Sequence, residues 1–189
     1  MTNLPPSHYP NIGSLGEDLV AQWLQSTGWV IIHRRFCCRW GEIDIIAEHA
    51  GGGEEIRRWG DGEIGETTPT NLPPHYPTLP MAHAHSILTF VEVKTRSLGS
   101  WDAGGRSAIT PQKQAKISRT AGIFLAQYPE KADYSCRFDV AIVYYQESKK
   151  MTGVTAQEAL ATSSAAGYQF RLQEYIPAAF DCLIDNDNG

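Results

Sequence analysis

The sequence predicts an α/β fold in which helices flank a central mixed sheet. Three observations support this prediction: apolar residues recur at helical spacing after Ser14, four runs have β-type composition, and a second helical pattern separates the last two runs. The four runs are 29–32, 41–47, 87–96 and 137–145. A further strand over 169–176 is expected at an edge of the sheet, within an otherwise irregular extension from about residue 146. The 189 residues suffice for one compact core, so we expect 1–189 to form a single domain.

The first helix is predicted to begin at a capping box in the stretch Ser-Leu-Gly-Glu, residues 14–17. In such a box the Ser14 hydroxyl and the Glu17 carboxylate satisfy free backbone N–H groups at the start of the helix. Gly28 provides the stop signal. The apolar residues at helical spacing between these points are Leu15, Leu19, Val20, Trp23 and Leu24.

Residues 51–86 interrupt the pattern between the second and third strands. The segment holds six glycines and five prolines with little periodicity. Such a composition cannot bury enough apolar surface to form a core element, so we expect a long flexible insertion. A functional lid is the alternative. His75, His83 and His85 in this segment suggest a transition-metal site, but no carboxylate or cysteine partner accompanies them, and chance proximity is the preferred interpretation.

The second helix is predicted to begin at Thr110, as the N-cap, with Pro111 in the first turn. It continues through Tyr128. Lys113 opens a stripe at three-to-four spacing that we expect to face the sheet rather than the solvent. The other members of this stripe are Ile117, Ala121 and Phe124.

Charged residues stand inside two of the predicted strands. Along 87–97, ILTFVEVKTRS, side chains alternate between the two faces, so Glu92, Lys94 and Arg96 share one face. On the preceding strand, Asp44 stands among isoleucines. A buried carboxylate without a partner is costly, and a divalent cation shared by Asp44 and Glu92 would remove that cost. Mg²⁺ prefers such oxygen ligands; an ion pair of Lys94 with either acid is the alternative.

Composition narrows the class of protein. The net charge is −5, but the acidic excess lies in 51–86 and 146–189, and the remainder holds eleven bases against ten acids, so a phosphate partner is not excluded. The N-terminus shows no signal-peptide pattern, and no run approaches the roughly 20 apolar residues that span a bilayer. The four cysteines lack C-x-x-C spacing. We therefore expect a cytoplasmic protein with reduced thiols and no membrane partner.

A basic and aromatic cluster precedes the second strand. Arg34, Arg35 and Arg39 are interleaved there with Phe36 and Trp40. Cations and aromatic rings together suit a nucleic-acid backbone and its exposed bases. A solvated turn with two anchoring aromatic residues is the alternative.

Four motifs follow one another in the chain: Glu17 on the first helix, GEID at 41–44, FVEVKTR at 90–96 and RFDV at 137–140. In this order they resemble the YraN-type family of predicted endonucleases, uncharacterised protein family 0102. These bacterial proteins are related to the PD-(D/E)xK nucleases and to archaeal Holliday-junction resolvases. The resemblance implies a restriction-endonuclease-like core. The long insertion departs from the family, whose members have a short hairpin there.

The resemblance also implies metal-assisted hydrolysis of phosphodiester bonds in DNA, in branched or single-stranded structures. Asp44, Glu92 and the Val93 backbone carbonyl would hold Mg²⁺ or Mn²⁺, and Glu17 would complete the shell unless it serves only the helix cap. Lys94 would orient the attacking water and offset charge in the transition state. A homodimer would suit two symmetric cuts. The alternative is a non-catalytic nucleic-acid-binding or protein-interaction module that keeps the nuclease fold.

Further basic residues are candidates for contact with the substrate. Lys113 would reach the phosphate from the second helix, or extend along the helix end. Arg96 would meet a phosphate or pair with Asp139, which we expect to be a structural, buried partner of Arg137 or Arg96. The full set of expected substrate contacts is Lys113, Arg96, Arg34, Arg35 and Arg39.

Overall fold

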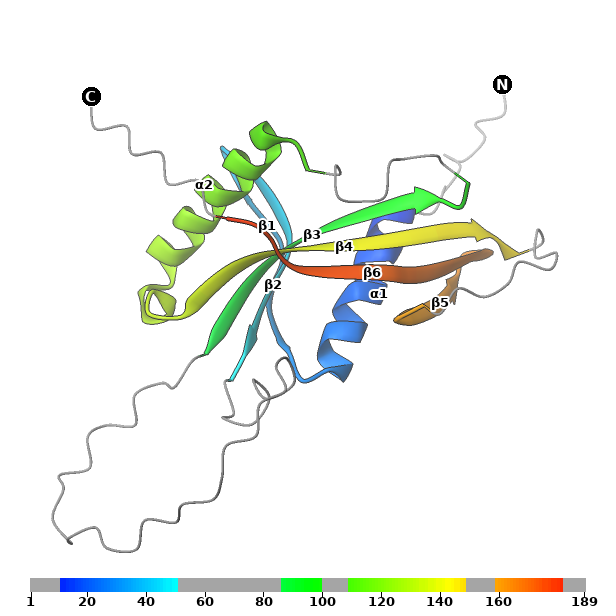
Figure 1. Ribbon diagram of the computed structural model, residues 1–189, viewed down its shortest axis with the longest axis horizontal. Helices are drawn as coiled ribbons and strands as arrows, with labels where there is room; N and C mark the ends of the chain where they lie inside the picture. The colour runs from blue at the N-terminus through cyan, green and yellow to red at the C-terminus, as the bar shows by residue number, and fades with distance from the viewer. Residues whose placement is uncertain (1–10, 51–85, 100–108, 149–158, 182–189) are drawn as a thin grey trace, which may run out of the picture.

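The computed structural model describes residues 11–50, 86–99, 109–148 and 159–181 (Figure 1). Apart from Ser86, the expected insertion lies outside these ranges, and so do His75, His83 and His85. The expectations of a flexible insertion, a lid and a histidine site therefore concern a part of the chain that the structure does not describe.

The described residues form one six-stranded mixed sheet with an α-helix packed on each face. The elements are α1 (Ile12–Ser26), β1 (Val30–Cys38), β2 (Gly41–His49), β3 (Ile87–Ser97), α2 (Pro111–Gln127), the 3₁₀ helix η1 (Pro129–Lys131), β4 (Ser135–Glu147), β5 (Ala161–Ala165) and β6 (Tyr168–Phe180). The strand order is β1-β2-β3-β4-β6-β5. The β3–β4 pair is parallel and the other neighbouring pairs are antiparallel. This arrangement confirms the predicted α/β class with a mixed sheet between helices.

Helix α2 connects the two parallel strands β3 and β4, as a parallel pair requires a crossover (Figure 1). Thr110 is its N-cap and its hydroxyl accepts from the Lys113 N–H, so the predicted start of this helix is confirmed. No helix in the described ranges is long and apolar enough to cross a membrane.

Helix α1 begins earlier than predicted. Its N-cap is Asn11, whose side-chain oxygen accepts a 3.1 Å hydrogen bond from the Ser14 N–H. The predicted capping box is therefore wrong, because Ser14 already lies in the first turn. Asn and Ser are near-equivalent N-caps, so spacing alone does not choose between them. The correction matters for Glu17, whose carboxylate has no capping role.

The C-terminal part is more regular than predicted. Strands β5 and β6 form an antiparallel hairpin whose turn residues, Ala166 and Gly167, both have positive φ, as in a type I′ turn. Strand β6 lies between β4 and β5, so the prediction of an edge strand over 169–176 is wrong. The described residues from 159 onward also contradict an irregular extension. Strand β5 reads ATSSA and shows no alternating apolar signal, because small polar residues suffice at an edge.

The two helices cover different residues of the same strands. On β3, Val91 belongs to the core cluster beneath α1, whereas Phe90 belongs to the cluster beneath α2. Helix α1 approaches the sheet so closely that a Cβ at Gly16 would lie 2.0 Å from Thr95 Oγ1. Alternation along β3 therefore places Glu92 on the α2 face, opposite Val91.

Candidate active site

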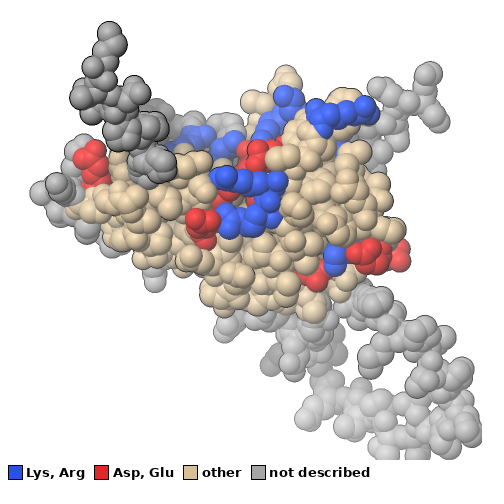
Figure 2. All heavy atoms as spheres, turned by 180° about the vertical axis from the view of Figure 1, so that it is seen from behind, with Lys and Arg blue, Asp and Glu red and all other residues tan. Residues whose placement is uncertain are grey.

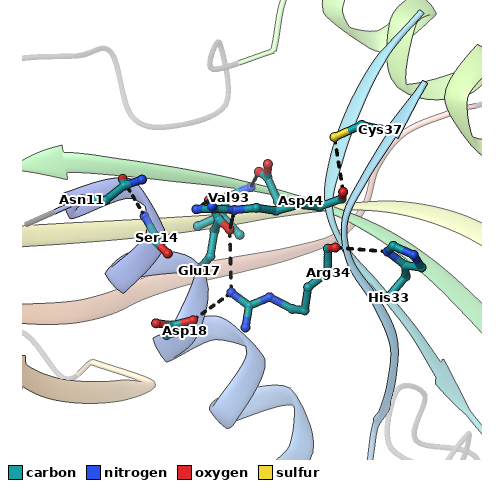
Figure 3. A network of polar contacts seen from close by, with 10 residues as sticks. Asn11, Ser14, Glu17, Asp18, His33, Arg34, Cys37, Asp44 and Val93 are labelled. Carbon is teal, nitrogen blue, oxygen red and sulfur yellow. Dashed lines mark hydrogen bonds and ion pairs between the residues drawn. The ribbon is translucent and has the colours of Figure 1, made fainter. Parts of the chain in front are cut away.

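The site forms where β2 and β3 separate. Their backbone ladder ends at the pair Ile45 and Val91. Asp44 directly precedes Ile45 in β2, and its carboxylate accepts a 2.7 Å hydrogen bond from the Val93 backbone N–H (Figure 3). The side chain of Asp44 thus replaces a main-chain partner and is fixed at the point where the strands part.

Glu92 lies beside this point and is almost completely buried, with 4% of its side chain exposed. Its Oε1 accepts a 2.7 Å hydrogen bond from Lys94 Nζ. Lys113 Nζ of α2 lies 3.0 Å from Oε2, although the angles do not give a hydrogen bond, so Oε2 lacks a hydrogen-bond donor among the described residues. The predicted orientation of Lys113 toward the sheet is confirmed, and two lysines converge on one buried carboxylate.

Glu17 reaches toward the same region from α1 (Figure 3). The Arg35 guanidinium donates two hydrogen bonds to its carboxylate, from Nε to Oε2 at 2.8 Å and from Nη2 to Oε1 at 3.1 Å. Arg34 Nη2 bonds to Asp18 at 2.9 Å and lies 3.7 Å from Glu17 Oε2. Two residues expected to contact substrate, Arg34 and Arg35, therefore have acidic partners on α1.

The backbone of Arg35 explains how two neighbouring residues reach one helix. Consecutive side chains of a regular strand point to opposite faces. Arg35 has φ +52°, in the left-handed region that non-glycine residues rarely occupy. This local twist brings its side chain to the side of Arg34. Register places Arg35 opposite Asp44, so the irregular backbone lies at the candidate site itself.

The protonation of Asp44 reflects the crowding of acids. Burial raises the pKa of Asp44 from its ordinary 3.8 to about 7, and the negative charges of Glu92 and Glu17 act in the same direction. The Val93 N–H and the Lys113 ammonium oppose this rise in pKa. Near neutral pH the Asp44 carboxyl is therefore partly protonated, and a nearby cation would favour its ionised form.

The oxygen atoms here fit a hard divalent cation. Asp44 and Glu92 supply carboxylates, and one Glu92 oxygen lacks a hydrogen-bond donor. The N–H and C=O of one strand residue point to the same side, so the Val93 carbonyl faces β2 beside Asp44. Two carboxylates and a carbonyl, completed by water, suit Mg²⁺. Within the described ranges no three Asp, Glu, His or Cys side chains are grouped as a metal site, and Glu17 is bonded to Arg35, so its place in a metal shell stays a prediction.

A second basic region lies at the tip of the β1–β2 hairpin. The guanidinium carbons of Arg39 and Arg119 lie 4.7 and 5.3 Å from the centre of the Trp40 ring. Figure 2 shows basic side chains mixed with acids at the middle of one face and further basic side chains near its upper edge. The sequence indicated Arg39 and Trp40 as members of a basic and aromatic cluster. It did not indicate that Arg119 contacts Trp40, because the approach of Arg119 from α2 depends on tertiary packing.

Asp139 lies on the face of the sheet opposite Glu92. Asp139 is fully buried and binds Arg137 Nε at 3.0 Å, the Tyr175 hydroxyl at 2.7 Å and the Ala178 N–H at 2.9 Å, which confirms its expected pairing with Arg137. Register pairs Asp139 with Val91, on the α1 face, whereas alternation puts Arg96 on the other face. The alternative Arg96–Asp139 pair is therefore wrong. Ala178 has φ +48°, in the left-handed region, and the hydrogen bond from its N–H to Asp139 stabilises this backbone conformation.

Comparison with known proteins places these residues in one family. The model of the uncharacterised protein family UPF0102 matches residues 16–143, which include Glu17, Asp44, Glu92, Lys94 and Lys113. A UPF0102 protein of Trichormus variabilis is 55% identical over 177 residues, covering 93% of this chain and 97% of the relative. One from a Nostoc species is 56% identical over 174 residues, covering 92% and 96%. One from Trichodesmium erythraeum is 40% identical over 185 residues, covering 92% and 90%. The chain belongs to the uncharacterised protein family UPF0102.

Proposed function

We propose that the protein is a metal-dependent endonuclease that hydrolyses phosphodiester bonds in DNA, with a restriction-endonuclease-like core. The observation that carries this proposal is the pair of acids at the parting of β2 and β3, Asp44 and Glu92, with Lys94 bonded to the second acid. This combination of carboxylates, a backbone carbonyl and a lysine suits phosphodiester hydrolysis better than a purely structural ion pair, because a structural pair gains nothing from the second acid.

Each residue has a distinct role in this proposal. Asp44, Glu92 and the Val93 carbonyl hold Mg²⁺ or Mn²⁺. When bound, the ion would lower the pKa of a water molecule and offset charge on the phosphate. Lys94, 27% exposed, is positioned by Glu92 to orient that water and to stabilise negative charge as it develops. Lys113, 34% exposed, approaches from α2 and contacts a phosphate oxygen.

Glu17 and the two arginines of β1 act by positioning. The Arg35–Glu17 pair joins β1 to α1 next to Asp44 and sets the electrostatic surroundings of that carboxyl. The contact of Arg34 and Arg35 with substrate stays a prediction, since phosphate would have to compete with Glu17 and Asp18 for them.

A cleavage assay on labelled duplex, single-stranded, flap and four-way-junction DNA tests this proposal. We expect cutting of at least one substrate with Mg²⁺ or Mn²⁺, and Glu92→Gln to reduce it at least about 100-fold. Glu42→Gln is the matched control, because Glu42 is exposed on the neighbouring strand. Intact substrates with both metals would refute the enzyme and favour a binding module that keeps the fold.

A further inference from the structure

The tip of the β1–β2 hairpin carries an exposed tryptophan beneath two arginines from different elements. Trp40 keeps 39% of its surface exposed, and Arg39 and Arg119 are both exposed. Arg39 comes from the turn and Arg119 from α2, and each guanidinium lies over the Trp40 ring. An exposed large aromatic ring with two cations is a common element of nucleic-acid surfaces.

The turn is fixed to α2 before any ligand binds. Cys38 Sγ donates to Thr120 Oγ1 at 3.5 Å, and the Trp40 N–H donates to the same sulfur at 3.4 Å. Gly41 lies against the helix, where an added Cβ would meet Lys116 Cβ at 3.5 Å. A prearranged surface loses little side-chain freedom on binding, which favours affinity.

Helix α2 links this surface to the candidate active site. Lys113, Lys116 and Arg119 recur every three residues and form one row of neighbouring positions on the helix. Lys113 contacts Glu92 at one end of the row, and Arg119 contacts Trp40 at the other. Six residues of helix span about 9 Å, comparable with two or three steps of a stacked strand at roughly 3.4 Å each.

We propose that Arg39, Trp40 and Arg119, continued by Lys116, bind a single-stranded stretch of nucleic acid that leads away from the Asp44–Glu92 site. This inference rests on the proposed function for its direction. Unpaired bases expose flat faces that stack on an aromatic ring or a guanidinium plane, whereas paired bases in a duplex hide them. The cations along α2 offset the phosphates of the same strand.

The test measures binding of a fluorescent oligothymidylate of about 15 nucleotides to the full-length protein in EDTA, so that no cleavage is involved. Trp40→Ala should weaken binding about tenfold, the loss of one stacked base, whereas Trp40→Phe should keep most of the affinity. Arg119→Ala should weaken binding and lower the salt slope by about 0.7. Arg171→Ala is the matched control, since it removes one charge on β6, which lies across the sheet from the β1–β2 hairpin.

Unchanged affinity of both alanine variants, with a lower melting temperature, would overturn this inference, because the stack would then serve only the turn. The inference would also be overturned if the two alanine substitutions weakened the binding of duplex DNA as much as that of single-stranded DNA, or if the wild-type protein did not bind the oligothymidylate. The proposed function fails separately. Binding that depends on Trp40 and Arg119, without cleavage of any substrate, would refute only the proposed endonuclease activity. Cleavage that is unchanged in the Trp40 and Arg119 variants would refute only the proposed binding surface.

Discussion

The carboxylate of Asp44 on β2 accepts a hydrogen bond of 2.7 Å from the backbone N–H of Val93 on β3. The bond lies just beyond the last backbone pair of these strands, Ile45 and Val91. It holds a half-buried acid beside the buried Glu92, where the two strands part.

Asp44 should make the stability of the metal-free protein fall as pH rises. Its folded-state pKa is about 7, above the ordinary 3.8, so the folded protein binds more protons than the unfolded chain between these values. The stabilising effect of the protonated carboxyl is complete below about pH 4 and is lost as pH rises through about 7. The full shift corresponds to at most about 4 kcal/mol, less the effect of partial solvation.

Denaturant unfolding at intervals between pH 4 and 8 measures this effect. Asp44→Asn keeps a side-chain acceptor for the Val93 N–H but cannot ionise, so its free energy of unfolding should decline less with pH than that of the wild type. Asp133→Asn is an exposed control and should follow the wild type. Parallel curves for Asp44→Asn and the wild type would show that the Asp44 pKa is not raised.

Lys94 should favour catalysis but weaken metal binding, because it competes with the metal ion for the Glu92 carboxylate. It donates to Glu92 Oε1, so Lys94→Gln removes a positive charge from a ligand of the proposed ion. We expect Mn²⁺ to bind the variant as tightly as the wild type or more tightly, and cleavage to fall about 100-fold. Calorimetry and the cleavage assay measure the two effects. Loss of Mn²⁺ binding and activity together would instead give Lys94 a structural role.

Gly16 should be required for the contact of α1 with the sheet. A Cβ at this position would lie 2.0 Å from Thr95 Oγ1, so Gly16→Ala should destabilise the protein by about 1–3 kcal/mol. Thr95→Ala in the same chain should restore much of this loss. Gly122→Ala is the control: it meets no atom within 4 Å on α2 and should stabilise by up to about 1 kcal/mol. Equal effects of the two glycine variants would contradict the close packing.

Asp139 should stabilise the fold without serving the metal site. Asp139→Ala leaves Arg137, the Tyr175 hydroxyl and the Ala178 N–H without their acceptor, so we expect a loss of about 3–5 kcal/mol. Tyr175→Phe removes only one donor and should cost about 1 kcal/mol. Mn²⁺ affinity of the folded variants, measured by calorimetry, should not change. A large fall in that affinity would place Asp139 in the site.

Periodicity predicted the elements whose apolar residues face a core. The alternation around Glu92 and the stripe from Lys113 to Phe124 both appear in the structure, because burial alone determines them. The start of α1 was misplaced since Asn11 and Ser14 are both good N-caps. Strand β5 was missed because its pairing with β6, and not its own composition, holds it in the sheet.

The candidate site was predictable in its acids and lysines, but not in its basic contacts. Strand alternation does not predict that Arg34 and Arg35 both reach α1, since that follows from the left-handed backbone at Arg35. The meeting of Arg119 with Trp40 likewise joins residues 79 positions apart in the chain. Such contacts depend on how the hairpin lies on α2.

A crystal of the protein soaked in Mn²⁺ shows directly whether Asp44 and Glu92 hold a metal ion. We expect an anomalous density peak about 2.0–2.2 Å from carboxylate oxygens of both residues, with the Val93 carbonyl at a similar distance. The peak should be absent in Glu92→Gln crystals and present in Glu42→Gln crystals. A wild-type soak with no peak between Asp44 and Glu92, or with Lys94 and Lys113 still bound to both oxygens of Glu92, would show that these acids do not form a metal site.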